Sequence, residues 1–463
     1  MVHYYLKCQG DRERFFEPYS QRPILSEYRR CTWPSAPIGC YLIYLWTYPL
    51  NGNTKPNTSN QVRIGLFFSD TGGGHRSATE ALQAGILKVF ADRFGHYNVH
   101  VQIDSIVENS HPLNRNFVQI YNYLLRHQQS AMKYYYWFIE TFKPNDSKFG
   151  WMITQPYVVK TLHDMKANLV VSVHPMSNQY IARGLRESGL RSQTKLVTVV
   201  TDPNGDFWSG WACHDADLTI VPNDLAQQRL IELGVEPSKI AIMGMPVHPS
   251  FVAPPSCSPE EFRQSLGLEK DLPTICINSG WAGGGNMIAI YRALKNVKRK
   301  VQVVFLCGHN RKLYEALKKE VSRSSVPTAV LPFHDTMADV MAACDLMVTK
   351  AGGLTSFEGV ARRLPMAIDM ITTPMPQEYG TARMLVEQGL ATAIQRADDI
   401  VGIVEKMTCR RDLEATPLPA KHQLDQVDAI YHISETLIGI ALGEIDTATF
   451  KSRLQPSRTT SSP

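Results

Sequence analysis

Residues 64–82 read IGLFFSDTGGGHRSATEAL, and the order of residue types in this stretch decides the fold. The apolar run 64–68 is too short for a helix and is typical of a buried strand in a parallel sheet. Three glycines follow at positions 72–74, and Ser77 precedes Glu80 by three residues, the spacing of a capping box at the start of a helix. The stretch therefore predicts a strand, a glycine loop and a helix in succession.

Such a loop gathers unpaired backbone N–H groups and the positive end of a helix dipole at one place, where an anion or an electron-rich oxygen can bind. The loop also carries His75, a side chain that can move a proton near neutral pH. Glycine runs before helices also occur in α/β proteins without a catalytic role there. The loop alone therefore leaves the function open.

Composition bounds the class of protein. The chain of 463 residues is 44% hydrophobic and 20% charged, which predicts a folded core with room for two α/β domains. A formal net charge of +5 is too small to argue for nucleic acid, although a local basic face would favour an anionic lipid or a nucleotide diphosphate. The nine cysteines show no CxxC pair and no zinc-ligand spacing, as expected for reduced thiols in the cytosol.

No apolar run approaches the ~18 residues that a membrane-spanning helix needs. Residues 40–50, CYLIYLWTYPL, are apolar and aromatic but too short for a span. Two interpretations stay open for them: a docking segment at a membrane interface, or a cover over part of the core.

Apolar strand-like runs alternate with helical segments over most of the chain, which predicts parallel sheets. The expected strands are 64–68, 100–106, 169–173, 196–200, 218–221, 240–243, 274–278, 301–306, 329–331 and 346–348. We predict an extension at 1–60, one Rossmann-like domain at 61–247, a second at 248–420, and a crossing helix with a disordered polar tail at 421–463. The two domains are expected to face each other across a cleft.

Polar side chains follow several of these strands, at the ends where ligands bind in doubly wound sheets. Asp104 lies near the carboxyl end of the second strand, and His174 and Asp202 follow the next two. In the second series, glycines 283–285 follow one strand and His309 follows another.

An aromatic stretch at residues 117–142 is helical in character and includes Tyr134 and Trp137 with Lys133 and Lys143 nearby. Rings beside cations suit a membrane interface, where amphipathic side chains lie among headgroups. A packed aromatic core explains the same composition, and the sequence does not decide between them.

A second glycine loop appears at residues 346–358, LMVTKAGGLTSFE. A strand ends at Lys350, Gly352 and Gly353 let a ligand approach the backbone, and a helix is expected to open at Thr355. Glu358 is placed either to complete a capping box with Thr355 or to accept hydrogen bonds from the ribose hydroxyls of a nucleotide.

The two signatures together resemble a known family. DTGGGHRSATEAL at 70–82 resembles the N-terminal signature of the monogalactosyldiacylglycerol synthase family, which is related to the bacterial lipid-intermediate N-acetylglucosaminyltransferase. The second glycine pair, the T-x-x-E spacing and a loop with Pro376, Gln377 and Glu378 resemble the nucleotide-sugar half of these glycosyltransferases. The resemblance spans residues 62–400, but the cysteine-rich segment of the plant enzymes is absent.

The resemblance implies two Rossmann-like domains of the GT-B glycosyltransferase fold. It also implies an inverting enzyme that moves galactose or glucose from a UDP-sugar to diacylglycerol, peripherally bound to the cytoplasmic face of an anionic membrane. By this reasoning the base is His75, with Asp104 and Asp202 as alternatives. Donor-binding residues are expected at Gly283, Gly284, His309, Lys350, Gly352, Gly353, Leu354, Thr355, Glu358, Gln377 and Glu378. Acceptor-binding residues are expected at Gly73, Gly74, His174, Tyr134 and Trp137.

No cofactor, metal or nucleic acid is expected, because no D-x-D cluster stands at a strand end to bind Mg²⁺. Three other functions stay open at this point. They are N-acetylglucosamine transfer to a lipid-linked carrier, UDP-sugar 2-epimerisation, and nucleotide or lipid binding without catalysis.

Overall fold

The structure is a computed structural model that describes residues 61–94, 97–128, 131–144, 146–281, 283–407, 428–447 and 450. The chain divides into a unit of residues 1–57 and a unit of residues 58–463, and every described residue belongs to the second unit. The predicted extension at 1–60, the segment 40–50 and the tail from Lys451 lie outside the described residues, as do residues 408–427 around the predicted boundary at 420.

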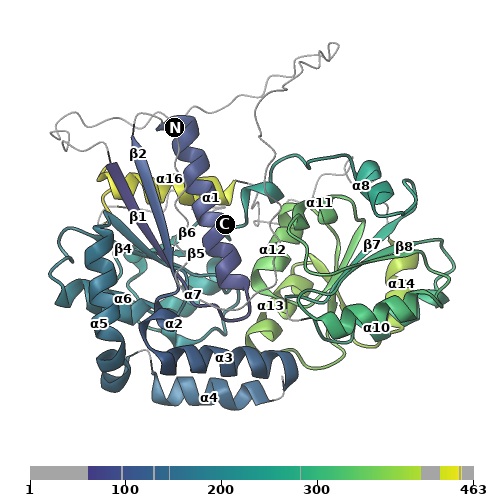
Figure 1. Cartoon of the computed structure of the whole chain (residues 1–463), viewed down its shortest axis with the longest axis horizontal. Helices are drawn as coiled ribbons and strands as arrows, with labels where there is room; N and C mark the ends of the chain where they lie inside the picture. The colour runs from purple at the N-terminus through teal and green to yellow at the C-terminus, as the bar shows by residue number, and fades with distance from the viewer. Residues whose placement is uncertain are drawn as a thin grey trace, which may run out of the picture. The chain divides into compact units, whose positions relative to one another are not determined.

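A six-stranded parallel sheet forms the first half of the described chain (Figure 1), in the order β2-β1-β3-β4-β5-β6. Its strands are β1 (Gln61–Phe67), β2 (Asn98–Asp104), β3 (Leu169–Ser172), β4 (Lys195–Val199), β5 (Leu218–Val221) and β6 (Ile240–Ile242). Its helices are α1 (Gly74–Arg93), α2 (Ile106–Ser110), α3 (Pro112–His127), α4 (Met132–Phe142), α5 (Lys148–Met165), α6 (Asn178–Glu187) and α7 (Asp224–Glu232). Strand order reverses direction between β1 and β3, so the loops after these two strands flank the switch point where ligands bind in such sheets.

A second six-stranded parallel sheet follows, in the order β12-β11-β10-β7-β8-β9. Its strands are β7 (Thr274–Asn278), β8 (Gln302–Leu306), β9 (Thr328–Leu331), β10 (Leu346–Thr349), β11 (Met366–Asp369) and β12 (Ala391–Ile394). Its helices are α8 (Pro259–Ser265), α9 (Met287–Ala293), α10 (Arg311–Val321), α11 (Met337–Ala342), α12 (Gly353–Ala361), α13 (Pro376–Glu387) and α14 (Asp399–Lys406). The switch point of this sheet lies between β7 and β10.

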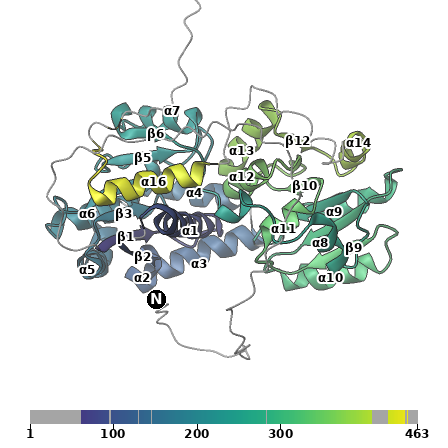
Figure 2. The same cartoon turned by 90° about the horizontal axis from the view of Figure 1, so that it is seen from above.

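Helix α16 (Ala429–Leu442) returns to the first half and packs on α1, β1, β3 and β4 (Figures 1 and 2). The two helices come so close that a Cβ on Gly85 of α1 would lie 2.5 Å from the Ser434 hydroxyl oxygen and 2.8 Å from Ile430. An ion pair of 2.6 Å between Arg93 of α1 and Glu435 of α16 also joins the two helices.

The predicted α/β fold with two Rossmann-like sheets is confirmed, and most strands begin and end near the predicted residues. β5 and β7 have the predicted bounds, whereas β2 begins at Asn98 instead of residue 100. The aromatic stretch 117–142 is two helices, because α3 ends at His127 and α4 begins at Met132. Figure 1 shows α3 and α4 side by side. Phe117 of α3 and Phe138 of α4 stack with 6.4 Å between their ring centroids.

Candidate active site

The glycine loop joins β1 to α1 at the switch point of the first sheet. Gly72 and Gly73 have φ values of 73° and 86°, and Gly73 is the N-cap of α1. The predicted capping box between Ser77 and Glu80 is wrong, because the left-handed turn starts the helix at Gly74, ahead of Ser77. The Ser77 hydroxyl instead donates to the Gly73 carbonyl oxygen at 3.2 Å. The first N–H groups of α1 therefore have no side-chain cap.

His75 is the second residue of α1, and its ring is held in one orientation. Nδ1 lies 3.0 Å from the Val173 carbonyl oxygen and 3.0 Å from the Thr201 hydroxyl. Because a carbonyl oxygen only accepts, Nδ1 carries the proton and Nε2 keeps a free lone pair. Burial lowers the pKa of His75 below its ordinary value, against an opposing effect of the Asp202 charge. The ring is therefore a neutral base at neutral pH.

His174, predicted to bind the acceptor, is buried beside His75 with 4.3 Å between ring centroids. Its Nδ1 accepts from the Met176 N–H at 3.1 Å, so its Nε2 is protonated and donates to the Thr71 hydroxyl at 2.8 Å. Burial and the neighbouring His75 hold its pKa well below the ordinary value. Both nitrogens are occupied, so His174 fixes the start of the glycine loop.

The two alternative bases lie in different places. Asp202 follows β4 and accepts from the Trp211 indole N–H at 2.7 Å, and it is close enough for its charge to act on the pKa of His75. Asp104 ends the edge strand β2, where its carboxylate accepts from the Tyr157 hydroxyl at 2.8 Å and from Asn109 at 3.3 Å. Burial raises the pKa of Asp104. The structure thus places Asp202, but not Asp104, beside His75.

The second glycine loop joins β10 to α12 at the switch point of the second sheet. Helix α12 begins at Gly353 with Gly352 as N-cap, so the predicted helix start at Thr355 is two residues late. Thr355 is then inside the helix, and the capping box with Glu358 does not form. The start of α12 packs on the loop after β4, because a Cβ on Gly353 would lie 2.8 Å from the Thr201 carbonyl oxygen.

Charged groups lie behind this helix start. Glu358 is only 9% exposed, its side chain has no hydrogen-bond partner among the described residues, and burial raises its pKa to about 7. Burial also raises the pKa of Glu378 in the first turn of α13, an effect that the positive charge of Lys350 opposes. Lys350 and the uncapped start of α12 favour an anionic group in the adjoining cavity, whereas the two carboxyl groups favour hydrogen-bond donors, so this end suits a polar, partly anionic ligand.

A cavity of about 690 Å³ brings the two glycine loops together, a size suited to a nucleotide-sugar. Its lining includes the predicted residues Gly73, Gly74, Lys350, Gly352, Gly353, Leu354, Thr355, Glu358 and Glu378. Other predicted residues are not in the lining: His75, His174 and Asp202 lie with the loops after β3 and β4, and Asp104 lies at the sheet edge. Gly283 and His309 lie next to lining residues, and the side chain of Gln377 is outside the described residues.

Trp281 is a lining residue that the sequence did not predict. Its indole lies against the glycine loop, 3.2 Å from where a Cβ of Gly73 would stand, and 5.5 Å from the His309 ring. His309 in turn stacks on Phe333, another lining residue, at 4.3 Å. The sequence feature that could have indicated Trp281 is its place as a lone tryptophan in the glycine-rich stretch 279–285.

Tyr134 and Trp137, predicted to bind the acceptor, lie on the outer side of α4 with 65% and 63% of their surface exposed. They are two of the large apolar residues that are exposed on three consecutive helices, and we call this set the apolar face. The set consists of Leu113, Phe117, Ile120 and Tyr123 of α3, Tyr134, Trp137 and Phe142 of α4, and Phe149 and Met152 of α5. A packed core is therefore the wrong interpretation for these rings, although Tyr121, Tyr135 and Tyr136 are partly buried.

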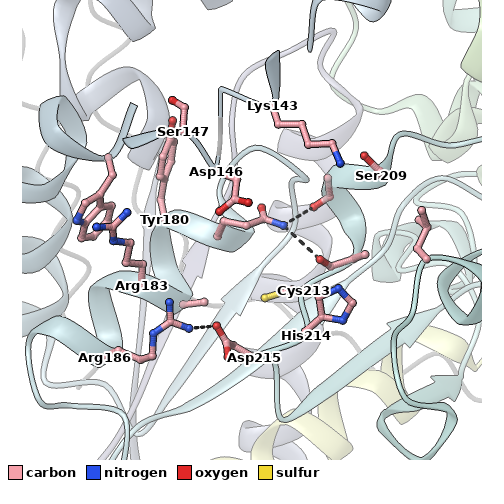
Figure 3. A pocket seen from close by; sticks show the side chains of 16 residues that line it. Lys143, Asp146, Ser147, Tyr180, Arg183, Arg186, Ser209, Cys213, His214 and Asp215 are labelled. Carbon is pink, nitrogen blue, oxygen red and sulfur yellow. Dashed lines mark hydrogen bonds and ion pairs between the residues drawn. The ribbon is translucent and has the colours of Figure 1, made fainter. Parts of the chain in front are cut away.

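A smaller pocket of about 300 Å³ is lined by α6, by the chain around the start of α5 and by residues 209–215, and contains none of the predicted residues (Figure 3). Its cations are largely neutralised, since Arg186 pairs with Asp215 and Arg183 pairs with Glu187 at 2.8 Å. The side-chain nitrogen of Gln179 donates to the Gly210 and Ala212 carbonyl oxygens, at 3.4 and 3.3 Å. The larger cavity is therefore the candidate active site.

Within the part of the chain that the structure describes, no helix is both long enough and apolar enough to cross a bilayer. No group of three or more His, Cys, Asp or Glu side chains in that part is arranged to hold a metal ion.

Comparison with known proteins gives two family matches. Residues 75–247 match the monogalactosyldiacylglycerol (MGDG) synthase model, and residues 287–423 match the glycosyltransferase family 28 C-terminal domain. The structure also resembles the crystal structure of MurG from Acinetobacter baumannii, with a TM-score of 0.50 and 13% identity over 81% of this chain and 99% of that one. At this identity the resemblance concerns the fold alone.

Two curated plant proteins share sequence with the chain over most of its length. A "probable monogalactosyldiacylglycerol synthase, chloroplastic" of Glycine max is 30% identical, covering 81% of this chain and 71% of that protein. Monogalactosyldiacylglycerol synthase 1 of Arabidopsis thaliana is also 30% identical, covering 77% of this chain and 66% of the plant protein. The first family match begins at His75, directly after the first glycine loop, and the second contains the second glycine loop. With 30% identity over most of the Glycine max protein, the chain belongs to the monogalactosyldiacylglycerol synthase family of glycosyltransferases.

Proposed function

We propose that the protein transfers a hexose, galactose or glucose, from a UDP-sugar to diacylglycerol. The observation that carries the proposal is the single cavity in which the glycine loop before His75 meets the glycine loop before α12. The family provides the reaction class, and the plant relatives are named for galactolipid synthesis. The donor lies on α12, with its ribose near Glu358 and its diphosphate at the helix start.

The reaction is a direct displacement at the anomeric carbon. Nε2 of His75 removes the proton from the acceptor hydroxyl, whose oxygen then forms the new bond to the anomeric carbon. The bond from that carbon to the UDP oxygen breaks, and UDP leaves with the electron pair. Attack from the face opposite the leaving group inverts the configuration of the sugar.

Charge on the departing diphosphate is stabilised by the free N–H groups at the start of α12 and by Lys350 in the lining of the cavity. These groups provide positive charge where negative charge develops. We therefore propose that transfer proceeds without a bound metal or other cofactor.

The apolar face on α3, α4 and α5 is the proposed contact with the membrane. Its rings are exposed, and four exposed cations with no ion pair in the described chain lie on the same elements: Arg115, Lys133, Lys143 and Lys148. The ammonium group of Lys133 lies 5.0 Å from the Tyr134 ring. Aromatic rings among unpaired cations match an anionic lipid surface, so we propose peripheral binding at the cytoplasmic face.

The decisive assay uses the purified full chain with diacylglycerol in anionic vesicles and EDTA. UDP-galactose, UDP-glucose and UDP-N-acetylglucosamine are offered separately, and both UDP release and lipid product are followed. We expect lipid product from one hexose donor, undiminished by EDTA. UDP release without lipid product, or product only from N-acetylglucosamine and a lipid-linked carrier, would reject the diacylglycerol proposal.

Trp137→Glu is expected to weaken vesicle binding by at least tenfold, because a charge replaces the ring that the membrane interface would bury on docking. The fraction of protein that sediments with anionic vesicles measures this effect. Leu225→Glu is the matched control, since Leu225 is 45% exposed on α7, outside the apolar face. Equal sedimentation of the Trp137 variant and the wild type would exclude this face as the docking surface. UDP affinity should be unchanged in both variants.

A further inference from the structure

The glycine loop is fastened to α3 by one side chain, Asn122. Its side-chain oxygen accepts from the Gly72 N–H at 3.0 Å, and its side-chain nitrogen donates to the Asp70 carbonyl oxygen at 2.8 Å. One amide therefore holds the backbone of the loop through a donor and an acceptor at once. Leu125, one turn further along α3, lies 3.3 Å from where a Cβ of Gly72 would stand.

The start of the loop is held separately by Glu108 of α2. Its Oε1 accepts from the Ser69 hydroxyl at 2.8 Å and from the Asp70 N–H, while its buried Oε2 has no partner. The loop is thus fixed by α2 at Ser69 and at the Asp70 N–H. Helix α3 holds the Asp70 carbonyl oxygen and, alone among these contacts, the Gly72 N–H next to the N-cap of α1. Movement of α3 relative to α1 would be transmitted to the loop first at Gly72.

Opposite sides of α3 have different neighbours. The side of α3 that faces the loop carries residues spaced three or four apart, which are Val118, Asn122 and Leu125. The residues of α3 that belong to the apolar face lie on the other side of the helix. Exposed rings and the loop contact are therefore separated only by the thickness of one helix.

We propose that Asn122 is a positioning residue that couples docking of the apolar face on a bilayer to the geometry of the glycine loop before His75. When a bilayer holds α3, Asn122 holds Gly72, and the loop keeps the first turn of α1 and His75 in the geometry that transfer requires. The proposal rests on the proposed function for its catalytic consequence. Its structural consequence, protection of the Gly72 amide, is independent of any reaction.

The first test is hydrogen exchange on the full-length wild-type protein, with and without vesicles of phosphatidylcholine and phosphatidylglycerol. We expect vesicles to slow exchange of the Gly72 amide, which donates to Asn122. In Asn122→Ala this amide should exchange fast under both conditions. Unchanged exchange at Gly72 in the wild type on vesicle binding would overturn the coupling, and this result needs no variant that folds.

The second test separates kcat from KM in the vesicle assay. We expect Asn122→Ala to lower kcat at least tenfold while KM for the UDP-sugar and the thermal midpoint stay unchanged, because donor binding is on the other sheet. Asn122→Asp keeps an acceptor for Gly72 but loses the donor for Asp70, so its kcat should lie between those of Asn122→Ala and the wild type. Wild-type kcat in Asn122→Ala would overturn the proposal.

Asn114→Ala is the matched control, because Asn114 is on the same helix and its amide donates only to the Ser110 hydroxyl, at 2.9 Å. Its exchange and kcat should equal those of the wild type. If the wild type transfers no hexose at all, the proposed function fails. The exchange measurement still decides whether the coupling exists.

Discussion

His75→Ala is expected to abolish measurable hexose transfer and to leave UDP binding intact. We expect kcat to fall by about 10²- to 10⁴-fold, the usual contribution of a positioned base. The reason is geometric: Nδ1 is used by Val173, so Nε2 is the nitrogen available for the proton of the acceptor hydroxyl. UDP affinity, measured by calorimetry, should stay the same because the donor contacts lie on α12.

The pH dependence provides a second check on His75. Burial lowers the pKa of the ring, so the wild type should keep full activity through neutral pH and lose it only below the ordinary histidine range. His163→Ala is the control, since His163 is exposed on α5. Full transfer by His75→Ala, or an acid limb above the ordinary histidine pKa, would assign the base to another residue.

Glu358→Gln is expected to stabilise the ligand-free protein above neutral pH while weakening UDP binding at least tenfold. The folded state raises the pKa of Glu358 from 4.5 to about 7, so between these values it retains a proton that the unfolded chain releases. The free energy of unfolding therefore falls as pH rises through this window, by on the order of 3 kcal/mol in total. Glutamine has the same shape without the charge, so the variant should not show this fall in the free energy of unfolding as pH rises.

Two measurements test this prediction: thermal midpoints at pH 5 and pH 8, and the Kd for UDP. The variant should match the wild type at the lower pH and melt at a higher temperature at the upper pH. Its affinity should fall because the carboxylate proposed to accept from both ribose hydroxyls is lost. Glu387→Gln is the control, since Glu387 is exposed and pairs with Arg383 at 3.4 Å. A lower midpoint with unchanged UDP affinity would make Glu358 a purely structural residue.

The sheets were predictable from sequence because buried parallel strands are short apolar runs followed by glycine or polar residues. Helix starts were harder to place. The capping box predicted at Ser77 and Glu80 is wrong, and the box that was one of two interpretations of Thr355 and Glu358 does not form, because glycines at the N-cap start α1 and α12 earlier than Ser77 and Thr355 indicated. Backbone geometry at those glycines, and not the spacing of hydroxyl and carboxyl side chains, decides where each helix begins.

Residues whose role depends on tertiary contacts are hard to identify from the sequence. Asn122 stands in an aromatic helix far from the glycine loop in sequence, and only the packing of α3 brings its amide to Asp70 and Gly72. Asp104 shows the opposite error, since a carboxylate at a strand end was predicted to join the site but its strand is at the sheet edge. Sequence places residues on elements, whereas the order of strands decides which ends meet.

The position of α16 affects how the chain can fold during synthesis. Helices α1 and α16 share one core, which includes Leu82, Ile86, Ile430, Ile433 and Leu437. Yet α16 leaves the ribosome only after the whole second sheet has been made. Until then, the emerging first sheet has an uncovered apolar surface where α16 will pack. The first half therefore cannot complete its folding before the second half has been synthesised. A chain that stops before residue 429 would keep an exposed apolar surface on its first half and would be prone to aggregate.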